Sequence, residues 1–209
     1  MGFKGVFFIC FLFIFVILQA SIGVSGRRLR SISKPDPDDG VGYARWLASQ
    51  NTWGVLSTIS LELKGAPFGN IVSFSDGLPD KGSGIPYFYL TALDPTARNA
   101  LMDERASLAI SEFPTGSCGK KDPENPSCAK LTLSGKLKLI KGNTKDAEIA
   151  ASALFTKHPE MKGWPQNHNF NFYKLDIEDI FLINWFGGPK PITVDQYLRH
   201  RMNQPALVM

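Results

Sequence analysis

The chain has 209 residues, of which 44% are hydrophobic and 20% are charged, and its formal net charge is +4 at pH 7. This length allows one domain with a sizeable buried core. The mild positive charge does not match the clustered lysine and arginine of nucleic-acid-binding proteins, so we expect no nucleic-acid partner.

The amino terminus has the pattern of a secretory signal peptide. Lys4 precedes an apolar run from Gly5 to Leu18, and small residues follow it. We predict a signal peptide at residues 1–20, with cleavage sites as far as residue 25. An uncleaved signal anchor is the alternative, but this run of about 14 residues is shorter than the roughly 20 that span a bilayer. We therefore expect entry into the secretory pathway, with no membrane attachment after cleavage, and a location outside the cell or in a lysosomal or vacuolar lumen.

The segment after the signal peptide has the composition of a flexible arm. Residues 26–39 are first basic and then acidic, with two prolines and few apolar side chains. Its arginines, which end at Arg30, match either a processing-protease site or a solvated basic run. We place the folded domain at residues 40–201 and a short tail at residues 202–209.

Capping residues and apolar periodicity predict four helices in the domain. The first is capped by Asp38 or Asp39 and runs to about Ser49, with Arg45 on its solvent side. Its inward residues are predicted to be Val41, Ala44, Leu47 and Ala48. The other helices begin at Pro95, with Asp94 as the cap, or span about Lys145–Thr156 and Val194–Arg201.

Six segments rich in β-branched and aromatic residues predict strands. They are Trp53–Leu61, Gly69–Ser75, Ile85–Thr91, Ser107–Phe113, Ala129–Ile140 and Phe170–Asn184. In the fifth segment the leucines alternate with polar residues, and Gly135 in its middle indicates a bulge or bend. Six strands with this many aromatic residues favour a barrel.

Two cysteines lie outside the predicted signal peptide, Cys118 and Cys128. An even pair in a secreted chain predicts a disulfide, which would stabilise the fold by about 3 kcal/mol or a little less. A metal site is the alternative, but the pair has no nearby histidine to complete the usual four ligands.

The segment from Asn70 to Asn99 carries a family resemblance. It consists of a strand, a loop of Asp, Gly, Pro and Ser from Asp76 to Ile85, a second strand and a helix start. Further matching motifs are Trp53–Ser60, Leu154–Met161 and Trp185–Lys190. Together they resemble the CREG family of secreted glycoproteins, within the FMN-binding split-barrel (pyridoxamine phosphate oxidase-like) superfamily. The resemblance implies an α+β, mainly β fold: a six-stranded split β-barrel with flanking helices, which assembles as a two-fold homodimer.

The same resemblance bears on a cofactor. Flavin-binding relatives hold the FMN phosphate with basic side chains, because a dianion needs charge-assisted hydrogen bonds. At the corresponding positions this chain has Asn70 and the run Pro95–Ala97, and CREG proteins are thought to block this pocket with a loop. We therefore expect no cofactor, although FMN stays an alternative. The residues that could rebuild a weak anion site, or serve only as cap, turn and surface residues, are Ser73, Ser75, Thr91, Arg98 and Lys130.

Catalytic and metal-binding motifs are missing from the sequence. His158, His168 and His200 have no zinc-site spacing, and no Gly-x-Ser-x-Gly nucleophile motif occurs. We expect His158 to end a helix and satisfy its last carbonyl groups. The aromatic residues near the carboxyl end fill the core by default, or bury a ligand or a subunit contact: Trp164, Phe170, Phe172, Tyr173, Trp185 and Phe186. A candidate family-specific loop surface comprises Asp76, Gly77, Pro79, Gly82, Gly84 and Pro86.

These observations lead to two function hypotheses. The first is a secreted or luminal, non-enzymatic homodimer that binds a protein partner in growth or differentiation control, or in a lysosome or vacuole. The second is a flavin- or haem-dependent oxidoreductase of the split-barrel superfamily. The sequence has no Asn-x-Ser/Thr acceptor site for N-linked sugar, because Asn125-Pro126-Ser127 contains the excluded proline. Sorting through sugars is therefore not expected.

Overall fold

A single antiparallel sheet organises the domain. The computed structural model describes residues 33–79 and 81–201, and its six strands pair in the order β2-β1-β4-β5-β6-β3. The strands are β1 (Trp53–Ser60), β2 (Ala66–Ser73), β3 (Tyr87–Leu90), β4 (Arg105–Ser111), β5 (Lys130–Leu139) and β6 (Asn171–Ile183). The predicted six-stranded split barrel with flanking helices is confirmed, and the strands differ from prediction mainly at their ends.

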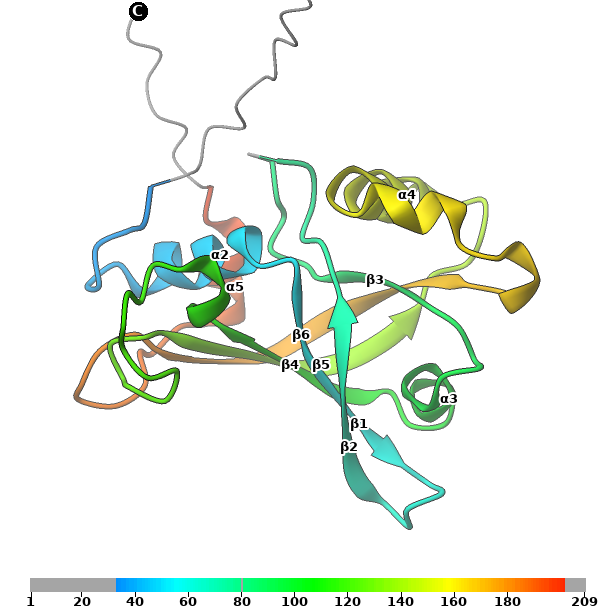
Figure 1. The fold of residues 1–209 in the computed structure, drawn as a ribbon, viewed down its shortest axis with the longest axis horizontal. Coiled ribbons are helices and arrows are strands. Elements are labelled where there is room, and N and C mark those ends of the chain that lie inside the picture. The colour runs from blue at the N-terminus through cyan, green and yellow to red at the C-terminus, as the bar shows by residue number, and fades with distance from the viewer. Residues whose placement is uncertain (1–32, 80, 202–209) are drawn as a thin grey trace, which may run out of the picture. The chain divides into compact units, whose positions relative to one another are not determined.

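The sheet curls without closing, and this leaves a split between its two edge strands. β2 and β3 lie at opposite ends of the strand order, yet Ser75, just after β2, forms an isolated antiparallel bridge with Tyr87. Figure 1 shows the curled sheet with the β1–β2 hairpin extending beyond it. Beyond the bridge, β2 and β3 do not pair, so each presents an unpaired edge to the split.

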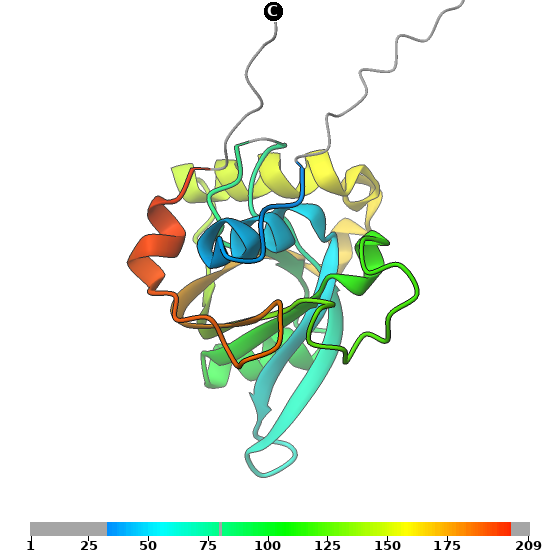
Figure 2. The same cartoon turned by 90° about the vertical axis from the view of Figure 1, so that its left-hand side faces the viewer.

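Each α-helix begins at a residue that caps it with its side chain. The α-helices are α2 (Gly40–Gln50), α3 (Pro95–Met102), α4 (Lys145–Lys157) and α5 (Val194–Arg199). Their caps are Asp39, Asp94, Thr144 and Thr193, each of which accepts a backbone N–H of the first turn. The described residues also form three short 3₁₀ helices: η1 (Phe113–Thr115) after β4, η2 (Pro159–Gly163) after α4, and η3 (Gln166–His168) after η2. Figures 1 and 2 both place α2 and α4 on the same side of the sheet.

The core lies between this side of the sheet and the helices. Its largest fully buried apolar and aromatic residues are Tyr43, Leu47, Leu56, Phe74, Phe88, Leu108, Leu131, Leu133, Leu137 and Tyr197. A second buried cluster, which includes Ala153, Leu154 and Met161, packs under α4. Arg45 belongs to this interior as well, with 1% of its surface exposed. The prediction that Arg45 points to solvent is therefore wrong.

Strand β5 and the end of β6 test two further expectations. The bulge expected at Gly135 is confirmed by a register shift between Ser134 and Gly135 in the β5–β6 pairing. Trp185 and Phe186, just after β6, are exposed, so core filling is the wrong interpretation for these two aromatic residues.

The loop between β4 and β5 contains the predicted disulfide. Cys118 and Cys128 are bonded, with their Cα atoms 5.2 Å apart. The buried carboxylate of Glu112 holds the same region, since it accepts from the Tyr43 hydroxyl at 2.8 Å and the Ala129 amide at 3.0 Å. The disulfide closes the loop on itself, and Glu112 connects the loop to the core through Tyr43 of α2.

Several predictions lie outside the described residues. They are the signal peptide, the arginine run that ends at Arg30, most of the arm and the tail at residues 202–209. Among the residues that the structure describes, none of the helices has the length and apolar character that a membrane crossing requires.

Candidate functional site

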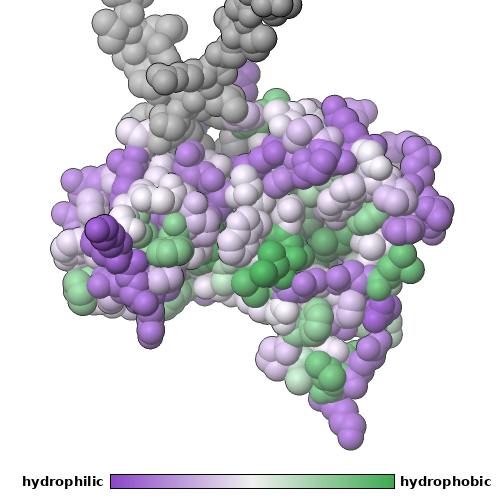
Figure 3. All heavy atoms as spheres, in the orientation of Figure 1, coloured by the Kyte–Doolittle hydropathy of each residue, from purple (hydrophilic) through white to green (hydrophobic). Residues whose placement is uncertain are grey.

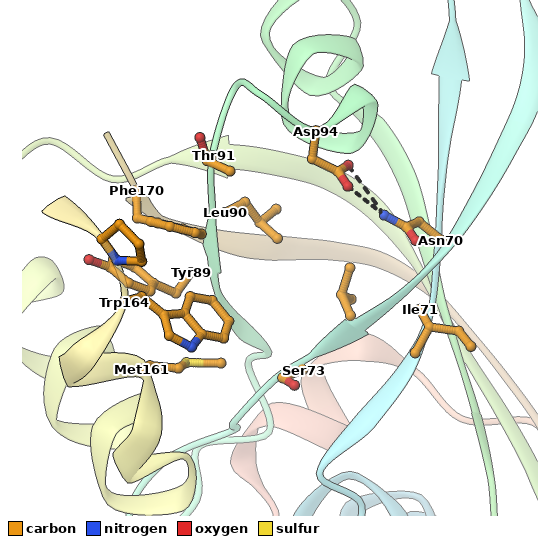
Figure 4. A pocket seen from close by; sticks show the side chains of 12 residues that line it. Asn70, Ile71, Ser73, Tyr89, Leu90, Thr91, Asp94, Met161, Trp164 and Phe170 are labelled. Carbon is orange, nitrogen blue, oxygen red and sulfur yellow. Dashed lines mark hydrogen bonds between the residues drawn. The ribbon is translucent and has the colours of Figure 1, made fainter. Parts of the chain in front are cut away.

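A pocket of about 450 Å³ occupies the split between the two edge strands. Twelve residues from β2, β3, the start of α3 and the segment after α4 line it (Figure 4). They are Asn70, Ile71, Val72, Ser73, Tyr89, Leu90, Thr91, Asp94, Met161, Trp164, Pro165 and Phe170. Its volume is in the range of small-molecule sites.

One wall of the pocket is aromatic. The Tyr89 ring of β3 stacks on Phe170 with a centroid separation of 4.9 Å and on Trp164 at 6.0 Å. Phe172 and Phe155 contact the same ring from behind, at 5.0 and 5.5 Å. Because Tyr89 contacts four other rings, this wall is held in place whether or not a ligand is present.

The opposite end of the pocket is polar and acidic. The Asn70 side-chain amide donates to both Asp94 carboxylate oxygens, at 3.2 and 3.0 Å, and to the Thr96 hydroxyl at 3.0 Å. Asp94 also accepts the Thr96 backbone N–H at 2.7 Å, as the cap of α3. Figure 4 shows Asn70 and Asp94 together, across the pocket from Trp164 and Met161.

The five candidate anion-site residues do not come together in the structure. Ser73 and Thr91 line the pocket, where the Thr91 hydroxyl donates to the His168 carbonyl. Ser75 is buried and donates to the Gly77 carbonyl at 2.9 Å. The Arg98 guanidinium donates to the Ala92 and Leu93 carbonyls at 3.2 and 3.0 Å, and the Lys130 ammonium donates to the Glu124 carbonyl. Neither cation lines the pocket.

The electrostatics of the pocket follow from this arrangement. Among the described residues that line it there is no lysine, arginine or histidine, and Asp94 is the charged side chain. The described part of the chain also lacks any cluster of three or more histidine, cysteine or acidic residues that could hold a metal ion. The pocket therefore suits an apolar or aromatic group, with a neutral or positive group near Asp94.

No described histidine lines this pocket, although the His168 carbonyl accepts from Thr91 and its ring lies 6.3 Å from the Phe170 ring, centroid to centroid. His158 is the residue after α4, and its backbone N–H caps that helix by donating to the Leu154 carbonyl. Its ring Nε2 lies 3.0 Å from the Phe74 carbonyl oxygen. The prediction that this ring satisfies the last helix carbonyls is therefore wrong, because the ring contacts the residue after β2 instead.

The candidate loop surface is in large part internal. Asp76, Gly84 and Pro86 are buried, Gly77 and Gly82 are half-buried, and Pro79 is exposed. The Arg45 guanidinium donates to the Tyr197 and His200 carbonyls at 2.9 and 2.7 Å, and also to the Gly82 carbonyl. The loop is thus fastened to α2 and α5, and only its middle is available as surface.

Sequence reasoning found parts of the pocket but not their assembly. Trp164 and Phe170 were predicted to fill the core or bury a ligand, and Asp94 was predicted only as a cap. Met161 carried no signal of its own, because its position depends on how η2 packs against β3. The approach of β2 and β3, which creates the pocket, is a property of the curled sheet.

The comparisons with known proteins agree with this fold. A family model for the CREG β-barrel matches residues 35–199. Protein CREG1 of Gallus gallus is 40% identical over 169 residues, covering 78% of this chain and 87% of that protein. Protein CREG1 of Homo sapiens is 41% identical over 167 residues, covering 78% and 75%. A heme binding protein from Mycobacterium smegmatis has a TM-score of 0.61 at 21% identity, covers 80% of this chain and 62% of its own, and shares the fold. The chain belongs to the CREG family.

Proposed function

We propose that this CREG-family chain enters the secretory pathway and acts as a non-enzymatic homodimer that binds a protein partner, with a pocket that no longer holds FMN. The observation that carries the proposal is the contact between Asn70 and Asp94. Asn70 and Thr96 stand where flavin-binding relatives are expected to grip the phosphate, and the Asn70 side-chain amide donates instead to the Asp94 carboxylate and to the Thr96 hydroxyl.

The charge at this end of the pocket opposes a phosphate. Two unit charges of like sign 4 Å apart near a protein surface repel by about 4 kcal/mol, and an FMN phosphate carries close to two. Arg98, the nearest cation to Asp94 in the sequence, donates to two backbone carbonyls, and its guanidinium lies 3.4 Å from the Glu62 carboxylate. A bound phosphate would therefore meet a carboxylate without a compensating cation.

Exposed apolar side chains on β1 and β2 support the homodimer. Trp53 and Val55 of β1 are 41% and 37% exposed, and Ile71 of β2, the register partner of Val55, is 68% exposed. We call these three residues the β1–β2 apolar face. On the side of the molecule in Figure 3, apolar residues gather over the strands and along the hairpin. A contiguous apolar patch on a soluble domain is typical of an interface.

An absorbance spectrum of the purified protein tests the loss of the cofactor. The full chain, expressed through the secretory pathway and supplied with FMN, is expected to be colourless after gel filtration. Flavin absorbance near one equivalent per chain would overturn the proposal in favour of an oxidoreductase, and a stoichiometric Soret band would do the same for haem.

Amino-terminal sequencing of the secreted product checks the cleavage site of the predicted signal peptide. Retention of the uncleaved chain in washed membranes would contradict secretion.

A further inference from the structure

The pocket between β2 and β3 has a composition that selects one kind of small molecule. We infer that it binds an aromatic compound bearing a protonated amine, whose ring lies against Tyr89, Trp164 and Phe170 and whose amine faces Asp94. The inference rests on the proposed function in one respect, that the pocket is free of a phosphate-bearing cofactor.

The aromatic wall supplies the site for the ring. Tyr89, Trp164 and Phe170 are each half-buried, so part of every ring faces the pocket while the rest is packed. Behind them, Met161 and Leu90 are buried and form an apolar floor. A planar ligand ring can stack here with little ordering cost, because contacts among the wall residues already fix their positions.

The acidic end supplies the site for the amine. The Asp94 carboxylate accepts from the Asn70 amide and from the Thr96 backbone N–H, which leaves further acceptor positions on its two oxygens. Asp94 is only half-buried, so a ligand can reach it. Because the pocket lining contains no cationic side chain, the negative charge of Asp94 is available to a ligand cation.

Backbone groups along the split add hydrogen-bonding positions between the two ends. In an antiparallel pair, every second residue directs its peptide groups away from the partner strand. The Phe74 backbone N–H donates to the Thr52 carbonyl, just before β1, so Phe74 directs its peptide groups toward β1. By the same alternation, Ser73 and Ile71 direct their backbone N–H and carbonyl groups away from β1. The Tyr87 backbone N–H and carbonyl both bond to Ser75 in the bridge that closes one end of the split. The backbone groups of Tyr89, two residues later, face the same side, toward β2.

These features exclude an anionic ligand and favour a cationic one. An aromatic carboxylate or phosphate could stack on the same wall but would be repelled at Asp94. A protonated amine gains a charge-assisted hydrogen bond at Asp94 that an anion cannot make. Discrimination by charge among ligands with the same ring is therefore the property that distinguishes this pocket from a general apolar cleft.

Three indole compounds that differ in charge test this directly. Tryptamine is cationic, tryptophol is neutral and indole-3-acetate is anionic at pH 7, and all carry the same ring. Titration calorimetry and ligand-observed NMR on the full chain are expected to rank tryptamine first, with at least tenfold weaker binding of indole-3-acetate. Equal affinity for the cation and the anion, or no binding of any of the three, would overturn the inference.

Two variants with matched controls assign the contacts. Asp94→Asn keeps a helix cap, because asparagine is also a good N-cap residue, and is expected to weaken tryptamine binding about tenfold without changing tryptophol binding. Asp103→Asn makes the same change of charge at the other end of α3 and is expected to leave both unchanged. Trp164→Leu is expected to weaken all three compounds, whereas Phe181→Leu, an exposed aromatic outside the pocket lining, should weaken none.

The outcome can be separated from that of the proposed function. Stoichiometric FMN in the purified protein would overturn the proposed function and this inference together. A colourless protein that binds none of the three compounds would overturn the inference alone. Val55→Lys places a charge in the β1–β2 apolar face and should prevent the proposed dimer from forming. If tryptamine bound only to this variant, the pocket would belong to an interface between two copies, which would also overturn the inference.

Discussion

Two of the residues that sequence reasoning placed wrongly, Arg45 and Asp76, are charged side chains that the fold buries. The apolar pattern of its helix places Arg45 on the solvent side, opposite the apolar residues. Its partners are the Gly82, Tyr197 and His200 carbonyls, which come from segments far along the chain. Helical periodicity contains no information about such contacts, so only the assembled structure reveals them.

Asp76, the second buried charged residue, has 3% of its surface exposed. Burial raises the pKa of its carboxyl group above the ordinary value of 3.8, although Lys157 of α4 and Arg45 of α2 oppose the shift. Burial raises the pKa of the Tyr197 hydroxyl of α5, and the Asp76 charge adds to that rise. Within the described part of the chain, the Asp76 Oδ2 atom accepts no hydrogen bond.

The raised pKa of Asp76 predicts how stability depends on pH. Between 3.8 and the raised value, the folded state binds this proton more readily than the unfolded state, so the Asp76 contribution to stability falls as pH rises through that window. Asp76→Asn removes the titrating group, and the difference in unfolding free energy between wild type and variant should therefore change with pH there. Denaturant unfolding at a series of pH values from 4 to 7.5 measures this difference.

Asp103→Asn provides the control for the pH series. Hydrogen bonds from Arg105 lower the pKa of Asp103 from 3.8 to about 2 in the folded state, so the titration of both states is essentially complete by about pH 5. The unfolding free energies of this variant and wild type should run parallel from pH 5 upward. Parallel curves for Asp76→Asn and wild type across the whole series would contradict the prediction.

At the scale of elements, local signals were sufficient where the element is defined by its own residues. The caps Asp39 and Asp94 mark the starts of α2 and α3 as predicted, because a capping contact spans only a few residues. Strand ends were less accurate, and β3 is limited to Tyr87–Leu90. Its length depends on pairing with β6, a strand more than eighty residues later in the chain.

The Gly135 bulge allows a test of one element against its neighbour. A Cβ atom at Gly135 would lie 2.0 Å from the Asp176 carbonyl oxygen, a backbone atom that cannot move without disturbing β6. Gly135→Ala is therefore expected to lower the free energy of unfolding by about 2 kcal/mol or more. Gly142→Ala is the matched control, because a Cβ atom there would have no neighbour within 4 Å.

Chemical denaturation of both variants measures the contrast. The control should stay within about 0.5 kcal/mol of wild type, or gain slightly from reduced freedom of the unfolded chain. Equal stability of the two variants would show that β6 adjusts to a side chain at the bulge, and the packing argument for Gly135 would then fail.

At the scale of the whole domain, the candidate site arises from the incomplete closure of the sheet. The pocket joins β2, β3, the start of α3 and the segment after α4, which come together only when the strand order places β2 and β3 at opposite edges of a curled sheet. Family resemblance predicted this fold and the missing basic residues. The acidic character of the pocket could not be predicted, because it depends on Asn70 and Asp94 meeting in three dimensions.

The β1–β2 apolar face leads to a prediction about assembly. Val55 lies at its centre, next to Trp53 on its own strand and opposite Ile71 on β2. If two copies bury this face, the wild-type chain should be a dimer by light scattering at micromolar concentration. Val55→Lys should then yield a folded monomer, because a lysine ammonium cannot be buried in an apolar contact without a partner.

Phe181→Lys is the matched control, because it introduces the same charge at a similarly exposed apolar position on β6 and should leave the dimer intact. A monomeric wild type, or a Val55→Lys variant that still dimerises, would exclude this face as the interface and would direct the search to the exposed Trp185 and Phe186.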